Sequence, residues 1–339
     1  MLVQGLMMEK IGEEFTSMKG QYWACGLCAL VATLTCCVLG PIMDAYGPLF
    51  LCYGATCFTS GYPFSLARCT RHWQYLLCMG VLGGIAKGLC MAVAAPMSAK
   101  IFKKRVGVAQ AVIMSGSSLG GVLYSQYFKY AFNNMGWKDA MQNYAIILGT
   151  VAHVAFLLSM SYHWIVPAAS LQTDTGGKQS VLQSYASWKE PFRNKAFVCF
   201  AGAMAFLDLG IYGMCVVTPQ VANQSDIKGI ETADVITGLS GASLFGRIIG
   251  GLMADRFGYF DTFLLSLSAE MVILGAFCTS FAHRSPALFL TSAVQWGLFS
   301  GSWMSLFPAC LGLLCRVQEF GKNYGKTFPY SHVVVYTHV

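Results

Sequence analysis

The stretch Gly40-Pro-Ile-Met-Asp44-Ala-Tyr-Gly47 returns later in the chain as Gly251-Leu-Met-Ala-Asp255-Arg-Phe-Gly258. Both copies keep a glycine, an aspartate and a second glycine at the same spacing, and both end a long apolar run. Glycine permits close helix approach or a positive φ, and aspartate can accept hydrogen bonds at a helix N-terminus. An ordinary turn would explain one copy, but two copies in equivalent places favour a repeated conformational latch.

The composition around both copies is strongly apolar. Hydrophobic residues make up 55% of the 339 residues and charged residues only 11%, whereas soluble domains contain roughly 25% charged residues. A helix needs ~20 apolar residues to cross the ~30 Å hydrocarbon core of a bilayer. Runs of this kind cover residues 22–40, 49–67, 75–99, 106–128, 143–165, 196–218, 235–254, 259–282 and 286–315. The sequence therefore predicts an all-α polytopic membrane protein with about nine transmembrane helices.

Basic residues gather in every second loop between the apolar runs. Short loops rich in lysine and arginine face the cytoplasm, so this alternation predicts the orientation of the helices. It places the segment before the first run outside and the C-terminal end inside, with the loop around Arg68 and Arg71 as a mild exception. The basic residues concerned are Lys100, Lys103, Lys104, Arg105, Lys178, Lys189, Arg193, Lys195, Arg316, Lys322 and Lys326.

The predicted orientation also bears on one modification site. The sequon Asn223-Gln224-Ser225 follows the sixth apolar run, and the orientation places it in an exoplasmic loop. N-glycosylation takes place on that side of the membrane, which makes Asn223 a candidate glycosylation site.

The duplicated motif resembles the major facilitator superfamily, whose conserved loop between the second and third helices has this Gly/Asp/Gly form. The second copy matches well, whereas the first has Ala45-Tyr46 where basic residues are usual. Ile101-Phe-Lys-Lys-Arg-Val-Gly-Val-Ala109 and Ser115-Gly-Ser-Ser-Leu-Gly-Gly121 look like the fourth-to-fifth helix region of fungal monocarboxylate-porter-like proteins. Gly246-Arg247-Ile-Ile-Gly-Gly251 fits the eighth helix of that subfamily, and the resemblance covers roughly residues 22–326.

The resemblance implies a fold of two helical bundles that rock around a central site. It makes the nine runs the second to tenth helices of a twelve-helix pattern, so the first, eleventh and twelfth helices are expected to be missing. The expected organisation is an exoplasmic segment 1–21, an incomplete first bundle 22–165, a cytoplasmic linker 166–195, an incomplete second bundle 196–315 and a cytoplasmic tail 316–339.

Charged residues inside the apolar runs are the candidate transport residues, because a charge at mid-bilayer is costly. At 1.5 Å per residue, Lys87 and Asp208 lie ~20 Å and Arg247 ~12 Å from the cytoplasmic ends of their runs. The resemblance places Lys87 and Asp208 on the fourth and seventh helices, which line the central cavity. Lys87 would bind an anion there or extend into the aqueous cavity. Arg247 falls on the eighth helix, at an arginine that the family uses for anionic substrates and proton coupling.

The family's carboxylate one turn before this arginine is replaced here by Ser243. Asp208 would supply the missing charge, since the ~8 Å difference in depth is about the reach of an arginine. We therefore hypothesise an Asp208–Arg247 pair that opens when Asp208 is protonated and frees Arg247 to hold a carboxylate. A static buried pair that fixes helix packing is the alternative.

Other polar and aromatic residues in the runs are interpreted as packing residues. Glu270 is expected on a peripheral helix, while Trp296 and Trp303 share one helical face and either shape a cavity wall or pack. Cys25 and Cys28 form a CxxC pair, but no second cysteine pair or histidine cluster completes a metal site. We predict no metal and no cofactor.

These features predict a secondary-active transporter of a small organic solute, with a monocarboxylate as one candidate, that works by alternating access. Proton coupling is left open. The alternatives are an efflux carrier for a fungal secondary metabolite and a truncated, non-transporting homologue. An enzyme is not expected, because no compact set of catalytic residues shares one depth. The predicted partners are the lipid bilayer and the solute, together with a proton in the coupled form; nucleic acid is not among them. The plasma membrane is the expected location.

Overall fold

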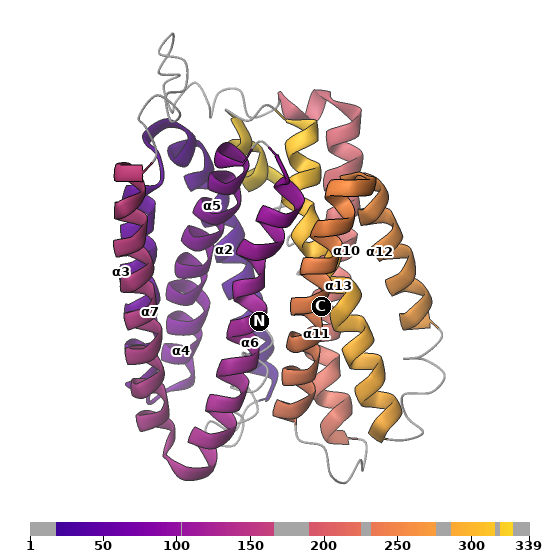
Figure 1. Cartoon of the computed structure of the whole chain (residues 1–339). Helices are drawn as coiled ribbons and strands as arrows, with labels where there is room; N and C mark the ends of the chain where they lie inside the picture. The colour runs from indigo at the N-terminus through magenta and orange to yellow at the C-terminus, as the bar shows by residue number, and fades with distance from the viewer. Residues whose placement is uncertain are drawn as a thin grey trace. The chain divides into compact units, whose positions relative to one another are not determined.

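The computed structural model describes residues 18–102, 104–165, 190–224, 232–275, 286–315 and 319–327, and its regular elements there are all helices (Figure 1). They are α2 (Met18–Tyr46), α3 (Leu49–Ala67), α4 (His72–Tyr75), the π-helical η1 (Leu76–Leu82), α5 (Gly83–Ile101), α6 (Val106–Asn134), α7 (Trp137–Ile165), the 3-10 turn η2 (Pro191–Arg193), α10 (Lys195–Gln224), α11 (Thr232–Phe257), α12 (Tyr259–Ile273) and α13 (Pro286–Leu314). A further short helix covers residues 320–327.

The predicted apolar runs are helical wherever the structure describes them, and run 75–99 is divided among α4, the π-helical η1 and α5. Six helices there are long and apolar enough to cross a membrane, which confirms an all-α polytopic membrane protein. They are Trp23–Tyr46, His72–Ile101, Val106–Asn134, Trp137–Ser161, Ala233–Phe257 and Leu288–Leu314. The count of nine spans and their place in a twelve-helix pattern stay predictions.

Several helices extend beyond the apolar runs that predicted them. The helix α6 continues to Asn134, so Lys129 lies within its last turns rather than in a loop. The helix α10 continues to Gln224, so the backbone of Asn223 belongs to a helix end; the Asn223 side chain and Ser225 lie outside the described residues. Hydropathy marks the membrane-embedded part of a helix, whereas its water-facing turns need not be apolar.

The chain divides into two compact units that interleave along the sequence. The first unit contains residues 98–134 and 212–313, which include α6, α11, α12 and nearly all of α13. The second contains residues 14–97, 135–211 and 314–339, which include α2, α3, α7 and the short helix 320–327. The first unit thus joins α6 to helices from the C-terminal half. The predicted division into bundles 22–165 and 196–315 stays a prediction.

Small residues allow close helix packing inside the second unit. A Cβ atom on Gly84 would lie 2.7 Å from the Cβ of Val31, and one on Gly88 would press against the carbonyl of Ala32. Both contacts bring α5 against the backbone of α2. Helices in membranes associate through such small-residue faces, because lipid gives no hydrophobic drive for association.

Candidate functional site

Arg247 lies in the middle of α11, in the first unit, with only 6% of its surface exposed. Its Nη1 donates to the Ser117 hydroxyl at 2.6 Å and to the carbonyl oxygen of Met114, both on α6. One turn away, the buried Ser118 hydroxyl donates to Ser243 Oγ at 3.2 Å. The observed acceptors of the guanidinium are therefore neutral oxygens.

Among the described residues of the first unit, the charge of Arg247 has no counter-charge. No described carboxylate of this unit lies within 4.0 Å of the guanidinium, and its Nε is buried without an acceptor. An uncompensated buried charge costs several kcal/mol. An anionic group beside Nε would accept the missing hydrogen bond and balance the charge.

The other two charged candidates lie in the second unit. Lys87 is on α5 and Asp208 is on α10, and both side chains are half-buried. Asp208 lies close enough to Tyr324 to act electrostatically on its hydroxyl. Because Arg247 belongs to the first unit, the hypothesised Asp208–Arg247 pair stays a prediction.

The second motif, residues 251–258, receives the N-terminus of α6. Asp255 accepts hydrogen bonds from the amides of Gly107 at 2.9 Å and Val108 at 3.0 Å. The Tyr259 hydroxyl donates to the same carboxylate at 2.9 Å. A Cβ atom on Gly251 would lie 2.7 Å from the carbonyl oxygen of Gly107, so only glycine permits this approach. The first amides of a helix have no partner within the helix and carry partial positive charge, which a carboxylate satisfies.

The first motif, residues 40–47, receives the short helix 320–327 in the second unit. Asp44 accepts from the amides of Gly321 at 3.2 Å and Lys322 at 2.8 Å. A Cβ atom on Gly321 would lie 2.8 Å from the carbonyl oxygen of Gly40. Each motif therefore combines an aspartate cap with a glycine–glycine contact. The last glycine of each also has a positive φ, 83° at Gly47 and 109° at Gly258.

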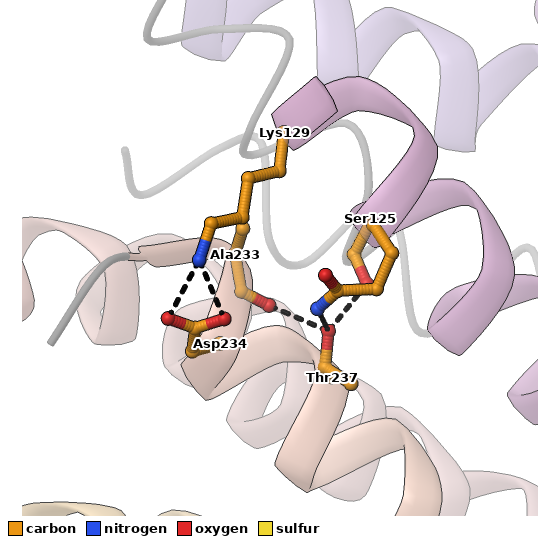
Figure 2. Close-up of polar contacts among 6 residues, drawn as sticks. Ser125, Lys129, Ala233, Asp234 and Thr237 are labelled. Carbon is orange, nitrogen blue, oxygen red and sulfur yellow. Dashed lines mark hydrogen bonds and ion pairs between the residues drawn. The ribbon is translucent and has the colours of Figure 1, made fainter. Parts of the chain in front are cut away.

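A second polar cluster joins the opposite ends of α6 and α11, and Figure 2 shows it. Lys129 Nζ lies 3.0 Å from both carboxylate oxygens of Asp234. One turn deeper, Thr237 Oγ1 donates to the Ala233 carbonyl at 2.7 Å and accepts from Gln126 Nε2 at 2.7 Å. Ser125 Oγ also lies 2.7 Å from this hydroxyl. The loop charges predict that this end of α6 faces the exterior.

Glu270 on α12 lies between two tryptophans of α13, both in the first unit. Trp296 Nε1 donates to Glu270 Oε1 at 2.7 Å, and Trp303 Nε1 donates to Oε2. All three side chains are buried. The sequence predicted a packing role for Glu270 and either a cavity-wall or a packing role for the two tryptophans; in the structure one carboxylate accepts hydrogen bonds from both indoles.

Sequence reasoning missed the residues that surround Arg247 and those that join the C-terminal end of α6 to α11. Ser117, Ser118 and Met114 carry no charge, and Lys129 falls just after the predicted run 106–128. A weak signal exists, because Ser118, Gly121 and Ser125 repeat at helical spacing and mark one small polar face of α6. Among the described residues there is no cluster of histidine, cysteine, aspartate or glutamate that could hold a metal ion.

Comparison with known proteins identifies one family. The Major Facilitator Superfamily model matches residues 2–329. The MFS transporter asaE of Aspergillus flavus is 26% identical over 299 residues, which cover 87% of this chain and 64% of that protein. The riboflavin transporter MCH5 of Saccharomyces cerevisiae is 24% identical over 318 residues, covering 90% and 60% respectively. The aspyridones efflux protein apdF of Emericella nidulans is 26% identical over 296 residues, covering 84% and 55%.

The chain thus spans between 55% and 64% of the length of these three relatives. Among solved structures, the proton:xylose symporter XylE matches with a TM-score of 0.71 and 13% identity, over 99% of this chain and 82% of that chain. The E. coli fucose:proton symporter FucP matches with a TM-score of 0.67 and 14% identity, over 99% and 88%. At such identities the likeness shows the fold, and the family and relatives are transporters rather than enzymes.

Proposed function

Because the chain belongs to the major facilitator superfamily, we propose that it is a secondary transporter of a small organic anion that works by alternating access. The burial of Arg247 is the observation that supports an anionic substrate. A buried guanidinium without a counter-charge among the described residues of its own unit gains most from a ligand that brings a negative charge and lone pairs. A monocarboxylate is the smallest ligand of this class.

Neutral oxygens hold Arg247 in place for this role. Ser117 and the Met114 carbonyl fix Nη1 without neutralising the positive charge. A carboxylate at the same position would instead form a permanent ion pair and compete with the substrate. The replacement of the family's carboxylate by Ser243, which bonds to Ser118, therefore favours ligand binding.

A metabolite exporter is the second candidate, and one relative favours it. The protein apdF is named as an efflux protein, whereas MCH5 is named as a riboflavin transporter. Only the name of apdF states a direction of transport. An anion-binding arginine serves either direction.

Proton coupling through Asp208 and Arg247 is the finer part of the proposal. Protonation of Asp208 would remove a negative charge and leave Arg247 to the substrate. Asp208→Asn mimics the protonated form, so uptake by this variant should lose its dependence on pH. Unchanged pH dependence would contradict the proton role of Asp208 without affecting the role of Arg247.

The two motifs are proposed to act as conformational latches at the cytoplasmic side. Each aspartate accepts hydrogen bonds from two of the first amides of a facing helix. Because one carboxylate accepts both bonds, the two bonds break together when the helices part. Such a contact favours one state of an alternating-access cycle.

The Arg247 proposal is tested by ligand-induced thermal stabilisation of the purified protein. Lactate, pyruvate and larger aromatic carboxylates are compared with their uncharged amides. A ligand at 100 times its Kd stabilises the folded protein by about 2.7 kcal/mol. Stabilisation by a carboxylate but not by its amide is expected, and Arg247→Gln should abolish it.

Ser117→Ala provides the matched control. This variant removes a neutral acceptor but keeps the charge, so binding should weaken only by the ~1 kcal/mol of one hydrogen bond. Equal stabilisation of the parent protein and Arg247→Gln by every carboxylate would contradict the assignment of Arg247.

A further inference from the structure

Glycines and polar side chains make the contacts along the α6–α11 seam, and Arg247 bonds to Ser117 and the Met114 carbonyl within it. A Cβ atom on Gly107 would lie 2.8 Å from the Gly251 carbonyl oxygen, and one on Gly121 would lie 2.5 Å from Ser240 Oγ. Between and beyond these glycines, Ser118 bonds to Ser243 and Ser125 to Thr237. Hydrogen bonds of this kind can be exchanged for bonds to water at modest net cost, so such a seam can separate reversibly.

The two ends of this seam are held by different chemistry. At the Asp255 end, the carboxylate accepts from two backbone amides and one tyrosine hydroxyl. At the other end, Lys129 and Asp234 form an ion pair whose side chains are 29% and 45% exposed. The predicted topology puts the first end at the cytoplasm and the second at the exterior.

We propose that Lys129, Asp234 and Thr237, with Ser125 and Gln126, form an outer latch that closes the exterior end of the α6–α11 seam and opens in each transport cycle. The proposal rests on the alternating-access function proposed above. The predicted bundles 22–165 and 196–315 contain α6 and α11 respectively, and in that function the two bundles move against each other. These residues are positioning residues and contact no substrate.

The geometry of the outer latch suits repeated opening. The Thr237 hydroxyl donates to the Ala233 carbonyl of its own helix and accepts across the seam from Gln126, while Ser125 Oγ lies 2.7 Å away (Figure 2). The ion pair above it is partly exposed, so both charges keep contact with water when they separate. Exposed pairs of this kind contribute little net energy, which allows fast opening.

The latch also lies between the exterior and the Arg247 region. Ser118 is eleven residues before Lys129 on α6, or ~16 Å deeper at 1.5 Å per residue. Ser118 is 4% exposed and bonds to the residue one turn from Arg247. Exposure of position 118 to the exterior therefore requires the outer latch to open.

The test uses Ser118→Cys as a reporter in intact cells that express the full chain. A membrane-impermeant maleimide is added outside, and the labelling rate is corrected for the native cysteines with the parent protein. Lys129→Glu and Asp234→Lys are each expected to raise the rate about fivefold, the upper range for loss of an exposed ion pair. The double variant with both changes restores opposite charges and should return the rate to within about twofold of the parent.

Two further variants separate a latch from a general loss of structure. Lys138→Glu makes the same charge change on an exposed residue of α7 and should leave labelling unchanged. Thr237→Val removes the hydroxyl without changing charge and should raise labelling by a smaller factor. Unchanged labelling in both single charge variants, or equal labelling in the single and double variants, would overturn the proposal, as would unchanged labelling in surface-expressed Thr237→Val.

The result is independent of the anion-binding test. Labelling of position 118 reports opening of the seam whether or not a solute is moved. Loss of carboxylate-specific stabilisation with intact charge-swap rescue would contradict only the proposed substrate class. Intact carboxylate binding without charge-swap rescue would contradict only the outer latch.

Discussion

The first and second motifs place an aspartate against the first amides of another helix, one in each unit, but they differ at the residue that follows the last glycine. In the second motif this residue is Tyr259, whose hydroxyl donates to Asp255 at 2.9 Å. In the first motif it is Pro48, which has no side-chain donor. Both motifs keep the aspartate because the first amides of the facing helix need a hydrogen-bond acceptor. Tyr259 adds one more hydrogen bond to Asp255 and so strengthens the contact in the second motif.

The comparison also shows why glycine and aspartate occur together. The glycine brings two helices to backbone contact, and only at that separation can the carboxylate reach the amides of the other helix. A larger residue at the glycine position would break both contacts. The motif is therefore one packing unit.

The largest effect is expected from filling the glycine–glycine contact in either motif. Gly40→Leu and Gly251→Leu would drive a side chain into the backbone of the facing helix. Destabilisation should reach or exceed ~3 kcal/mol, the upper range for overpacked sites, and size-exclusion chromatography of a fluorescent fusion would show little folded protein. Gly116→Leu is the control, because nothing lies within 4 Å of a Cβ at Gly116. Profiles of the motif variants that match the control would show that the contacts are not tight.

The second largest loss of stability is expected when the charge of either motif aspartate is removed. Asp44→Asn and Asp255→Asn keep the size of the side chain, but the new side-chain NH2 group faces the backbone N–H donors of the other helix. Each should cost about 1.5–3 kcal/mol, as for hydrogen bonds to charged groups, measured as a lower thermal unfolding midpoint. If only one of the two variants shifted the midpoint, the two motifs would not be structurally equivalent.

Substituting the last glycine of each motif should cost less stability than removing the aspartate charge, and the cost should be the same in both motifs. Gly47→Ala and Gly258→Ala force a side chain into a positive-φ backbone, which costs about 1–2 kcal/mol. Gly61→Ala on α3 should be neutral or stabilising, because this residue has open space and lies within a helix. Thermal unfolding of the three variants checks the order, and a stabilised Gly47→Ala would contradict it.

The smallest effect tests the difference between the motifs. Tyr259→Phe removes one hydrogen bond to Asp255 and should cost ~1 kcal/mol. In the Asp255→Asn background the same change should cost less, because the two groups share that bond. A double-mutant cycle by thermal unfolding measures this coupling, and full additivity would mean that Tyr259 acts elsewhere.

Hydropathy and the duplicated motif predicted much of the fold. The length of an apolar run predicts a membrane-spanning helix because the chain must cross the hydrocarbon core as a helix. The aspartates of both motifs were expected to cap helices. The partner helices were beyond sequence reasoning, since Asp44 and Lys322 are 278 residues apart and Asp255 and Val108 are 147 apart.

The candidate site was predicted less completely. Arg247 stands out because a charge in an apolar run is rare, whereas its neutral partners on α6 have no such signature. Lys129 and Asp234 were equally hidden, because charges near helix ends are common and their pairing over 105 positions depends on helix packing.

The composition of the α6–α11 seam has a thermodynamic consequence. The contacts described along this seam are made by glycines, polar and charged side chains and a backbone carbonyl, so parting them exposes little hydrocarbon. The heat-capacity change of such a process follows the apolar area exposed. The equilibrium between closed and open seam should therefore have a nearly constant enthalpy. A plot of the logarithm of that equilibrium constant against reciprocal temperature should be straight, whereas a leucine-lined seam would give a curve.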